Sequence, residues 1–348
     1  MKVSFGILIL FLFGCGSNTS TNIVNEDPKN LDSLIIMREK IYLADTANMA
    51  YRKLYIDALL KRGNQSYKEH NYSKLLTDAA RAFRLDSANL ETRLLYADAL
   101  TNKMDRSFDD IAAAQRHYKM ITEKMPTNVR ALVGLASTYT QQTNFEEAIK
   151  ILDSALKIDK KYRDAYVMKG TIYRLMGRLD LAKSSYETAI QQDKEFYEAY
   201  VMLGALYQAE KNEICLQYFQ SAVALKPKDP EILFSLAYAE QVFEYPDKAM
   251  ITYKKMVGLN NNVYQAQALN QIGVIKQYNF NQLDSAIYYY NSATQSDSTL
   301  VEAWHNLGLC YEEKKQLSQA MRSYGKALHF NPQYEPSRKR ADKLKYAR

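Results

Sequence analysis

The sequence contains few residues that break helices. Only 7 of its 348 residues are Pro and 12 are Gly, which excludes Pro-rich and collagen-like architectures and a chain interrupted by frequent turns. Hydrophobic residues make up 47% and charged residues 24%, a balance too apolar for a disordered chain. The chain is rich instead in tyrosine, with 28 residues, whose large rings suit packing between helices. The composition therefore favours long runs of packed helix.

Cysteine is scarce, and positive charge is concentrated at one end. Cys15, Cys215 and Cys310 are too few for a disulfide framework. The formal net charge is +7, but residues 335–348 hold six basic and two acidic groups, which leaves only +3 for the other 334 residues. A nucleic-acid binder carries a basic stripe across its folded surface. This charge distribution argues against a nucleic-acid partner.

The N-terminus has the composition of an export signal. Lys2 precedes an apolar run at residues 3–13, which at about 1.5 Å per residue is too short to cross a hydrocarbon core of about 30 Å. The run closes with Leu-Phe-Gly-Cys at residues 12–15, which resembles the lipobox of bacterial lipoproteins. That resemblance implies removal of residues 1–14 and acylation of Cys15. The alternative is an ordinary secretory signal with an incidental cysteine.

The lipoprotein resemblance also implies a location. Several acyl chains, at about 0.8 kcal/mol per buried methylene, would anchor the protein to a membrane without a spanning helix. Residues 15–30 read as a polar tether with a root-mean-square reach of about 20 Å. By resemblance to lipoprotein sorting rules, the absence of Asp after Cys15 favours the outer membrane. We therefore expect a protein of the bacterial cell envelope that faces the periplasm.

The body of the chain repeats with a period close to 34 residues. Ala136, Gly170 and Gly204 are each 34 residues apart, as are Ala148 and Ala182. The unit that begins at residue 301 shows the pattern most fully, with Trp304, Leu307, Gly308, Tyr311, Ala320, Tyr324, Ala327 and Pro332. This pattern is similar to the tetratricopeptide repeat signature, in which each unit is a pair of helices.

The resemblance predicts the fold and the domain organisation. We expect an all-α, right-handed α-solenoid of about eight tetratricopeptide helix-turn-helix repeats with capping helices, stabilised by the stacking of neighbouring units. The predicted segments are a signal peptide at 1–14, the lipidated Cys15 and tether at 15–30, an N-terminal capping helix at 31–55, repeats at 56–89, 90–128, 129–162, 163–196, 197–229, 230–263, 266–300 and 301–334, and a basic C-terminal capping helix at 335–348.

Two departures from the repeat pattern predict local irregularities. The unit at 90–128 holds five extra residues, and its polar stretch 103–110 fits a lengthened turn between the two helices. In the unit that begins at 230, Ala237 and Glu240 replace the Gly and Tyr of its neighbours, and Gly258 and three asparagines at 260–262 follow. Gly and Asn accept left-handed backbone conformations. We expect a softer joint or a change of pitch there.

Catalytic and metal-binding motifs are not evident. The chain has no phosphate-binding loop, no zinc-protease helix motif and no metal-spaced Cys or His pair. The four histidines fall at different places in different units, and Cys215 and Cys310 stand where neighbouring units have small residues, which favours buried thiols. The sequence therefore predicts a protein that is not an enzyme and uses neither a cofactor nor a metal.

The resemblance implies a peptide-binding groove. In tetratricopeptide proteins the first helix of each unit lines the concave side, through places two, five, nine and twelve, counted from the first residue of the unit. Place five here is apolar in six consecutive units, which indicates either a hydrophobic strip for a protein or peptide partner or side chains half buried between units. The candidate groove residues are Leu60, Asn64, Tyr67, Lys68, Leu94, Val133, Val167, Arg174, Val201, Gln208, Phe234, Tyr238, Gln241, Asn270 and His305.

The favoured function is a membrane-anchored periplasmic adaptor or scaffold for an envelope complex. A glycan-binding or nutrient-binding lipoprotein on the same scaffold is the alternative, but such proteins carry long insertions and the largest insertion within a unit here is five residues. A cryptic enzyme is a weaker alternative. The basic residues of 335–348 fit a solvated cap or a contact with anionic lipid headgroups, and such a contact would weaken with salt.

The lipid anchor makes a direct prediction. Replacing Cys15 with Ser removes the sulfur that the lipobox resemblance assigns to acylation, so we expect Cys15→Ser to shift the protein from the membrane fraction to the soluble fraction. Cell fractionation and immunoblotting measure the shift, with Cys215→Ser as a control that leaves fractionation unchanged. A Cys15→Ser protein that still sediments with membranes would place the anchor elsewhere.

Overall fold

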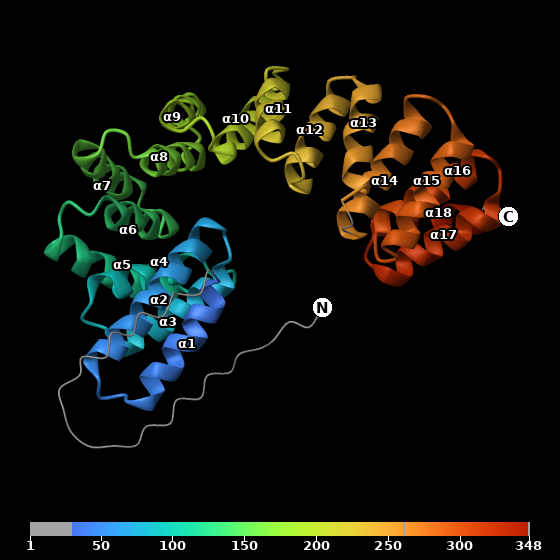
Figure 1. Cartoon of the computed structure of the whole chain (residues 1–348). Coiled ribbons are helices and arrows are strands. Elements are labelled where there is room, and N and C mark those ends of the chain that lie inside the picture. The colour runs from blue at the N-terminus through green and yellow to red at the C-terminus, as the bar shows by residue number, and fades with distance from the viewer. Residues whose placement is uncertain (1–29, 260–261, 347–348) are drawn as a thin grey trace, which may run out of the picture. The chain divides into compact units, whose positions relative to one another are not determined.

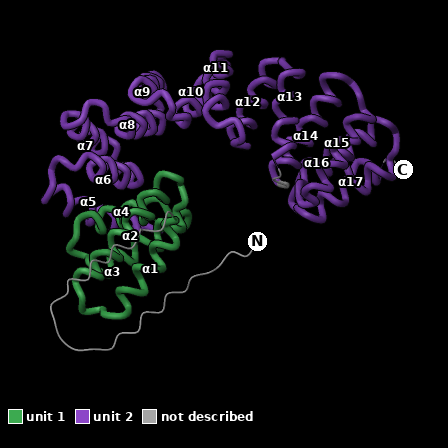
Figure 2. The backbone as a smooth tube through the Cα atoms, in the orientation of Figure 1, with its two compact units in different colours: residues 1–106 green, residues 107–348 purple. Residues whose placement is uncertain are grey.

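The computed structural model describes residues 30–259 and 262–346, and all regular structure within them is helical (Figure 1). The prediction of an all-α repeat solenoid is confirmed. The signal peptide, Cys15 and almost all of the tether lie outside the described residues. The described helices divide between two compact units, Met1–Arg106 (unit 1) and Ser107–Arg348 (unit 2) (Figure 2).

Four of the described helices lie in unit 1, and the other described helices lie in unit 2. Unit 1 holds α1 (Leu31–Ala44), α2 (Met49–Lys68), α3 (Tyr72–Leu85) and α4 (Leu90–Asn102). Unit 2 holds α5 (Phe108–Lys124), α6 (Val129–Gln141), α7 (Phe145–Ile158), α8 (Arg163–Leu175), α9 (Leu179–Gln192), α10 (Tyr197–Ala209), α11 (Cys215–Leu225), α12 (Pro230–Val242), α13 (Pro246–Val257), α14 (Asn262–Tyr278), α15 (Leu283–Ser296), α16 (Val301–Glu313), α17 (Leu317–Phe330) and α18 (Glu335–Tyr346).

The N-terminal cap differs from its prediction as a single helix over 31–55. Helix α1 ends at Ala44, and α2 begins at Met49 after a short polar turn. The side chain of Asn48 caps the new helix by accepting hydrogen bonds from the backbone N–H groups of Ala50 and Tyr51, which satisfies donors that have no partner within the helix. The first repeat pair therefore begins seven residues before residue 56, and α1 packs against it.

The short turn between the two helices of a unit uses left-handed backbone. His70, Thr143, Lys211, Glu244 and Lys315 all have φ between 55° and 62°, and Gly177 at the same place has φ 73°. Each stands at place fifteen of its repeat, two residues after the end of the first helix. A left-handed residue other than Gly costs roughly 1 kcal/mol. The recurrence of this conformation shows that the helix pairing, and not the local residue type, sets the turn.

The two helices of a single repeat cross where a glycine meets an aromatic ring. A Cβ added at Gly170 would lie 2.6 Å from Cε1 of Tyr186, and one at Gly204 would lie 2.7 Å from Cε1 of Phe219. Gly273 and Tyr290 repeat the arrangement, as do Gly308 and Tyr324. Tyr186, Tyr290 and Tyr324 are fully buried. The ring of the second helix thus occupies the space that the absent side chain of the first helix leaves.

The C-terminal cap and the lengthened link lie where the sequence predicts them, whereas the predicted joint is only partly described. Helix α18 forms as predicted, with Ala341 and Leu344 buried against Ala320 and Tyr324 of α17. Helix α4 ends at Asn102 and α5 begins at Phe108, so the lengthened link lies where it was predicted. Residues 260–261 of the predicted joint lie outside the described residues, and the joint stays a prediction.

The glycine contacts predict opposite effects of one substitution at two positions. Gly170→Ala places a methyl group against the Tyr186 ring, and overpacking of this kind costs about 1–3 kcal/mol. Gly325→Ala in α17 meets no atom within 4 Å, so it should stabilise the chain by about 0.5–1 kcal/mol through its better helix propensity. Urea unfolding followed by circular dichroism should show a lower midpoint for the first variant and a higher one for the second. Equal shifts would contradict the close crossing.

Candidate functional site

The first helices of successive repeats contact one another in unit 2. Helix α10 contacts α12, α12 contacts α14, and α14 contacts α16. We call the exposed surface of these helices the first-helix face. Places five, nine and thirteen are four residues apart and so share one side of each helix.

The middle of the first-helix face is an exposed apolar surface, which we call the central patch. It consists of Ala205 and Ala209 on α10, Tyr238 and Val242 on α12, and Tyr278 on α14, with the half-buried Val274 of α14 beside them. Tyr238 is 46% exposed, Val242 is 45% exposed and Tyr278 is 61% exposed. Contiguous apolar side chains on a soluble surface mark an interaction site more often than isolated ones do.

A glutamine stands beside the central patch on each of its three helices. Gln208, Gln241 and Gln277 all occupy place twelve. The buried hydroxyl of Tyr253 donates to Oε1 of Gln241 at 3.4 Å, and the Tyr290 hydroxyl donates to Oε1 of Gln277 at 3.0 Å. Gln208 has no such partner because the ring behind it belongs to Phe219. The tyrosines of the helix crossings therefore orient two of the three amides.

No charged residue stands at places five, nine, twelve or thirteen of α10, α12 and α14. Charges border this region instead. Arg174 stands at place twelve of α8, and Glu312 and Glu313 stand at places twelve and thirteen of α16. Acidic residues also occupy place two, in the first turn of α10 and α12. The central patch is an uncharged stretch between charged neighbours.

A buried carboxylate lies on α12 but points away from the central patch. Glu240 is 5% exposed, and its Oε2 accepts a hydrogen bond from Thr252 Oγ1 of α13 at 2.8 Å. Burial raises the pKa of the Glu240 carboxyl. The side chain fills place eleven, where the three preceding repeats have tyrosine. It serves the packing of α12 on α13 and adds no charge to the patch.

The predicted place-five residues are less accessible than a binding strip requires. Leu60 is 7% exposed and packs in a cluster with Leu75 and Leu95. The other apolar members are half buried, and four of them pack against core clusters: Val133, Val167, Val201 and Phe234, with Leu94 half buried as well. Their burial matches the alternative of packing between units. A direct role for them in binding stays a prediction.

The last two place-five residues are engaged with the protein itself. Asn270 is 6% exposed, and its Oδ1 accepts a hydrogen bond from Asn306 Nδ2 at 3.0 Å. His305 Nδ1 lies 2.9 Å from the hydroxyl of Ser337 in α18, and its ring packs near Tyr324 and Tyr334. Helix α18 thus covers the place that the sequence assigned to a groove histidine.

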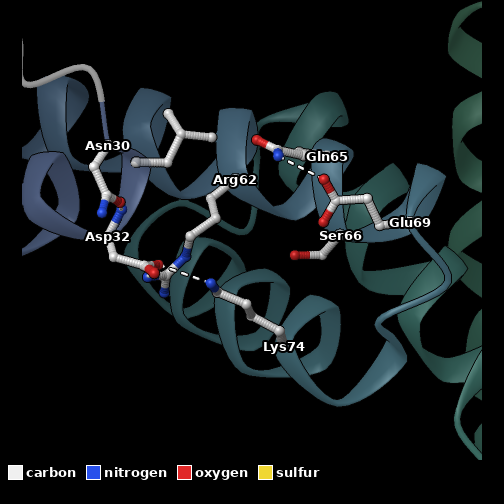
Figure 3. Close-up of a pocket in the computed structure, with 8 residues that line it drawn as sticks. Asn30, Asp32, Arg62, Gln65, Ser66, Glu69 and Lys74 are labelled. Carbon is white, nitrogen blue, oxygen red and sulfur yellow. Dashed lines mark hydrogen bonds and ion pairs between the residues drawn. The ribbon is translucent and has the colours of Figure 1, made fainter. Parts of the chain in front are cut away.

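A network of ion pairs, part of which Figure 3 shows, joins α1, α2 and α3 of unit 1. Arg62 of α2 forms a bidentate pair with the buried Asp78 of α3, through contacts of 2.6 and 2.8 Å, and also reaches Asp32 of α1. Lys74, and then Arg62, lower the pKa of the Asp32 carboxyl. These charges hold α1 and α3 onto α2. Sequence reasoning missed this network, because its ion pairs join residues 16 to 42 positions apart in the chain.

The remaining candidates of unit 1 and α8 are dispersed. Asn64 Nδ2 donates to the Leu60 carbonyl of its own helix at 2.9 Å. Tyr67 is half buried beside Leu75, and Lys68 and Arg174 are exposed.

Sequence reasoning also omitted place thirteen, which supplies Ala209, Val242 and Tyr278 to the central patch. The spacing of four residues from place nine was the signal that could have found them.

The described part of the chain contains no assembled cysteine or metal site. Cys215 and Cys310 are free and fully buried, as predicted, and burial raises the pKa of the Cys310 thiol to about 12. Within residues 30–259 and 262–346, no three His, Cys, Asp or Glu side chains gather as a metal site would require. In the same residues no helix has the length and apolar character needed to span a membrane.

Comparisons with known proteins identify the repeats. Family models described as the tetratricopeptide repeat match residues 107–168, 164–196 and 301–334. The chain therefore contains tetratricopeptide repeats. A solved structure, the C-terminal part of a TPR repeat-containing protein from Cytophaga hutchinsonii, matches with a TM-score of 0.58 at 17% identity over 70% of this chain and 97% of that one. This likeness concerns the fold.

Curated relatives share the repeats over parts of their length. The tetratricopeptide repeat domain-containing protein PYG7, chloroplastic, of Arabidopsis thaliana is 36% identical over 80 residues, which is 23% of this chain and 26% of that protein. The BBSome complex member BBS4 homolog of Drosophila melanogaster is 22% identical over 247 residues, 66% of this chain and 49% of that protein. The chain thus spans less than half the length of either relative.

The contact between His305 and α18 predicts a pH-dependent stability. Burial, and then the positive charge of Arg340, lower the pKa of His305 below 6.5, against the smaller opposing effect of Glu312 and Glu302. Since the folded state favours the neutral ring, this contribution is fully present above the pKa of the unfolded state. It is lost as the pH falls from there through the lowered folded pKa.

We therefore expect the natural protein to lose more of its free energy of unfolding than His305→Gln as the pH falls from about 7.5 to about 5. Urea titrations at several pH values measure the difference. Parallel pH profiles for the two proteins would show that protonation of His305 does not destabilise the α17–α18 packing.

Proposed function

We propose that this chain of tetratricopeptide repeats is a non-catalytic adaptor that holds a protein partner in the bacterial cell envelope. An acylated Cys15 would anchor it to the outer membrane, with the repeats in the periplasm. The observation that carries the binding role is the exposed central patch on α10, α12 and α14. The anchor and the location rest on the lipobox resemblance at residues 12–15 and on the polar tether.

The repeat class supports the binding role. Tetratricopeptide proteins typically mediate protein–protein interactions, and homologues of this fold are generally non-catalytic scaffolds. The physical reason is that stacked helix pairs form an extended surface from many units, each of which contributes side chains at the same places. The central patch is such a surface, because identical places on three consecutive first helices build it.

The glycan-binding alternative has less support in the arrangement of the repeats. Long insertions are what build the sugar site in glycan-binding lipoproteins on this scaffold. The lengthened link between α4 and α5 holds only five residues, 103–107. An exposed surface of alanine, valine and tyrosine with amides at its edge suits a polypeptide, whose backbone pairs with amides and whose side chains cover apolar area.

The proposal is tested by crosslinking in cells followed by pull-down of the chain. The test variant combines Val242→Glu and Tyr278→Ala in the central patch. The matched control combines Ile251→Glu and Tyr288→Ala, which are 58% and 66% exposed and lie on the second helices α13 and α15. All four side chains are exposed, so we expect little effect on folding, which circular dichroism checks.

We expect the natural chain and the control to capture one envelope protein reproducibly, and the test variant to lose most of it. Capture of the same partner by all three chains would move the binding site away from the first-helix face. The absence of a reproducible envelope partner for the natural chain would contradict the adaptor function itself.

A further inference from the structure

We propose that a small cavity between α1, α2 and α3 of unit 1 binds a free α-amino acid, with the ligand carboxylate near Lys74 and Ser66 and the ligand ammonium group near Glu69 (Figure 3). The cavity has a volume of about 230 Å³, which is below the range of about 300–1,000 Å³ for pockets that bury drug-sized ligands. It involves residues of unit 1 alone, whereas the central patch belongs to unit 2. The inference does not depend on the proposed adaptor function.

The cavity is open because the first repeat has a serine, Ser66, at place eleven. Four other repeats have a tyrosine at this place, namely Tyr139, Tyr173, Tyr207 and Tyr311. The Tyr207 ring stacks on Tyr218 of α11 with ring centroids 5.4 Å apart, and its hydroxyl donates to Oε1 of Glu187 on α9 at 3.5 Å. A tyrosine at place eleven thus fills the space between the second helix of its own repeat and the second helix that precedes it. In the first repeat the corresponding space lies between α3 and α1, and serine leaves it open.

The Ser66 hydroxyl is a buried polar group without a partner in the fold. Ser66 is 2% exposed and lines the cavity, and its hydroxyl forms no hydrogen bond with the described residues. Figure 3 shows this hydroxyl directed into the space that faces Lys74 and Asp32. Buried side-chain polar groups generally have a hydrogen-bond partner, and a helical serine often finds one in the carbonyl four residues before it. A ligand in the cavity would supply the missing partner.

Two cations that line the cavity keep spare hydrogen-bond donors. The Lys74 ammonium group has three N–H donors, and it pairs with Asp32 Oδ1 at 2.8 Å. The Arg62 guanidinium has five, of which two bond the buried Asp78 and one bonds Asp32. Donors therefore remain for the carboxylate of a ligand, beside the Ser66 hydroxyl.

The lining also carries a carboxylate that lacks a cation. Glu69 Oε1 accepts a hydrogen bond from Gln65 Nε2 at 2.6 Å, and the Glu69 carboxylate forms no ion pair with the described residues. An anion alone would be repelled by Glu69, and a cation alone would be repelled by Lys74. An amino acid carries both charges, so each of them meets a side chain of opposite sign.

The position and polarity of the lining distinguish this cavity from a groove on the first-helix face. The lining residues of α2 stand at places seven, ten, eleven and fourteen, which differ from the groove places two, five, nine and twelve. Seven of the eight lining residues are polar or charged, and only Leu31 is apolar. Because a large apolar side chain would find little apolar area to contact, the cavity favours amino acids with small or polar side chains.

The experiment uses the purified full-length chain in lipid nanodiscs, with empty nanodiscs as the blank. The probes are glycine, L-alanine and L-serine, with methylamine and acetate as matched ligands that carry one charge each. Saturation-transfer NMR, titrated with each probe, measures the dissociation constants. We expect at least one of the amino acids to bind about tenfold more tightly than methylamine or acetate.

Substitutions in the lining should weaken binding of the amino acid. Ser66→Tyr introduces the residue of the other repeats and should reduce affinity by tenfold or more. Ser66→Ala should reduce it by about two- to tenfold without lowering the urea midpoint, because the hydroxyl has no partner in the fold. Lys74→Gln should weaken binding, and Glu69→Gln should narrow the preference for the amino acid over acetate. The controls Lys61→Gln and Ser87→Ala, at exposed positions of unit 1 outside the lining, should change neither affinity nor preference.

Four results would overturn the inference. They are the failure of every amino acid to bind, equal binding of the amino acids and the ligands with one charge, unchanged affinity in a Ser66→Tyr chain that circular dichroism shows to be folded, and a lower urea midpoint for Ser66→Ala. The adaptor function is tested separately, because its variants lie on α12 and α14.

Discussion

The structure depends on the close approach of the two helices within each repeat. A glycine on the first helix, such as Gly170 or Gly273, leaves room for a fully buried aromatic ring from the second. Each ring contributes a large apolar area that neither helix could bury alone. Because every unit depends on its partner helix and on its neighbours for burial, stability accumulates along the array and is not concentrated in one core.

The same rings link the interior of the repeats to their exposed face. Tyr253 and Tyr290 fill the helix crossings, and their hydroxyl groups reach through to Gln241 and Gln277 on the first-helix face. A buried hydroxyl needs a hydrogen-bond partner, so the packing requirement of the interior fixes the orientation of the half-buried Gln241 amide and the buried Gln277 amide. Where phenylalanine replaces tyrosine, as in Phe219, this constraint on the surface is absent. The orientation of these amides is in this sense a consequence of core packing.

Polar contacts join the first and last described helices, α1 and α18, to the repeats. At the N-terminal end, Arg62 joins α2 to Asp78 of α3 and Asp32 of α1. At the C-terminal end, Ser337 of α18 meets His305, and Arg340 meets Glu312. An exposed ion pair alone contributes little. The buried Asp78 is different, because loss of Arg62 would leave a carboxylate in the interior without its charge partner.

The recurring positions of the repeat could be predicted from the sequence, because each repeat packs its two helices with the same residue types at the same places. Gly or Ala at the crossing, a large ring opposite it and a helix every half unit follow from that repetition, and so does the burial of Cys215 and Cys310. The separate helix α1 was harder to predict, because the end of one helix at Ala44 and the cap of the next at Asn48 depend on local hydrogen bonds that no repeat pattern contains.

The tertiary structure decided which side chains of the first helices remain accessible. In sequence, place five looks like the apolar strip of a groove, but the stacking of neighbouring units buries Leu60 and half buries Val201, while α18 covers His305. Places nine and thirteen, which include Tyr238 and Tyr278, remain exposed beyond those contacts. The sequence by itself determined the repeat and its helices, since these follow from local periodicity. How successive helices cover one another decides which of these side chains remain exposed. That covering is set only when the repeats stack.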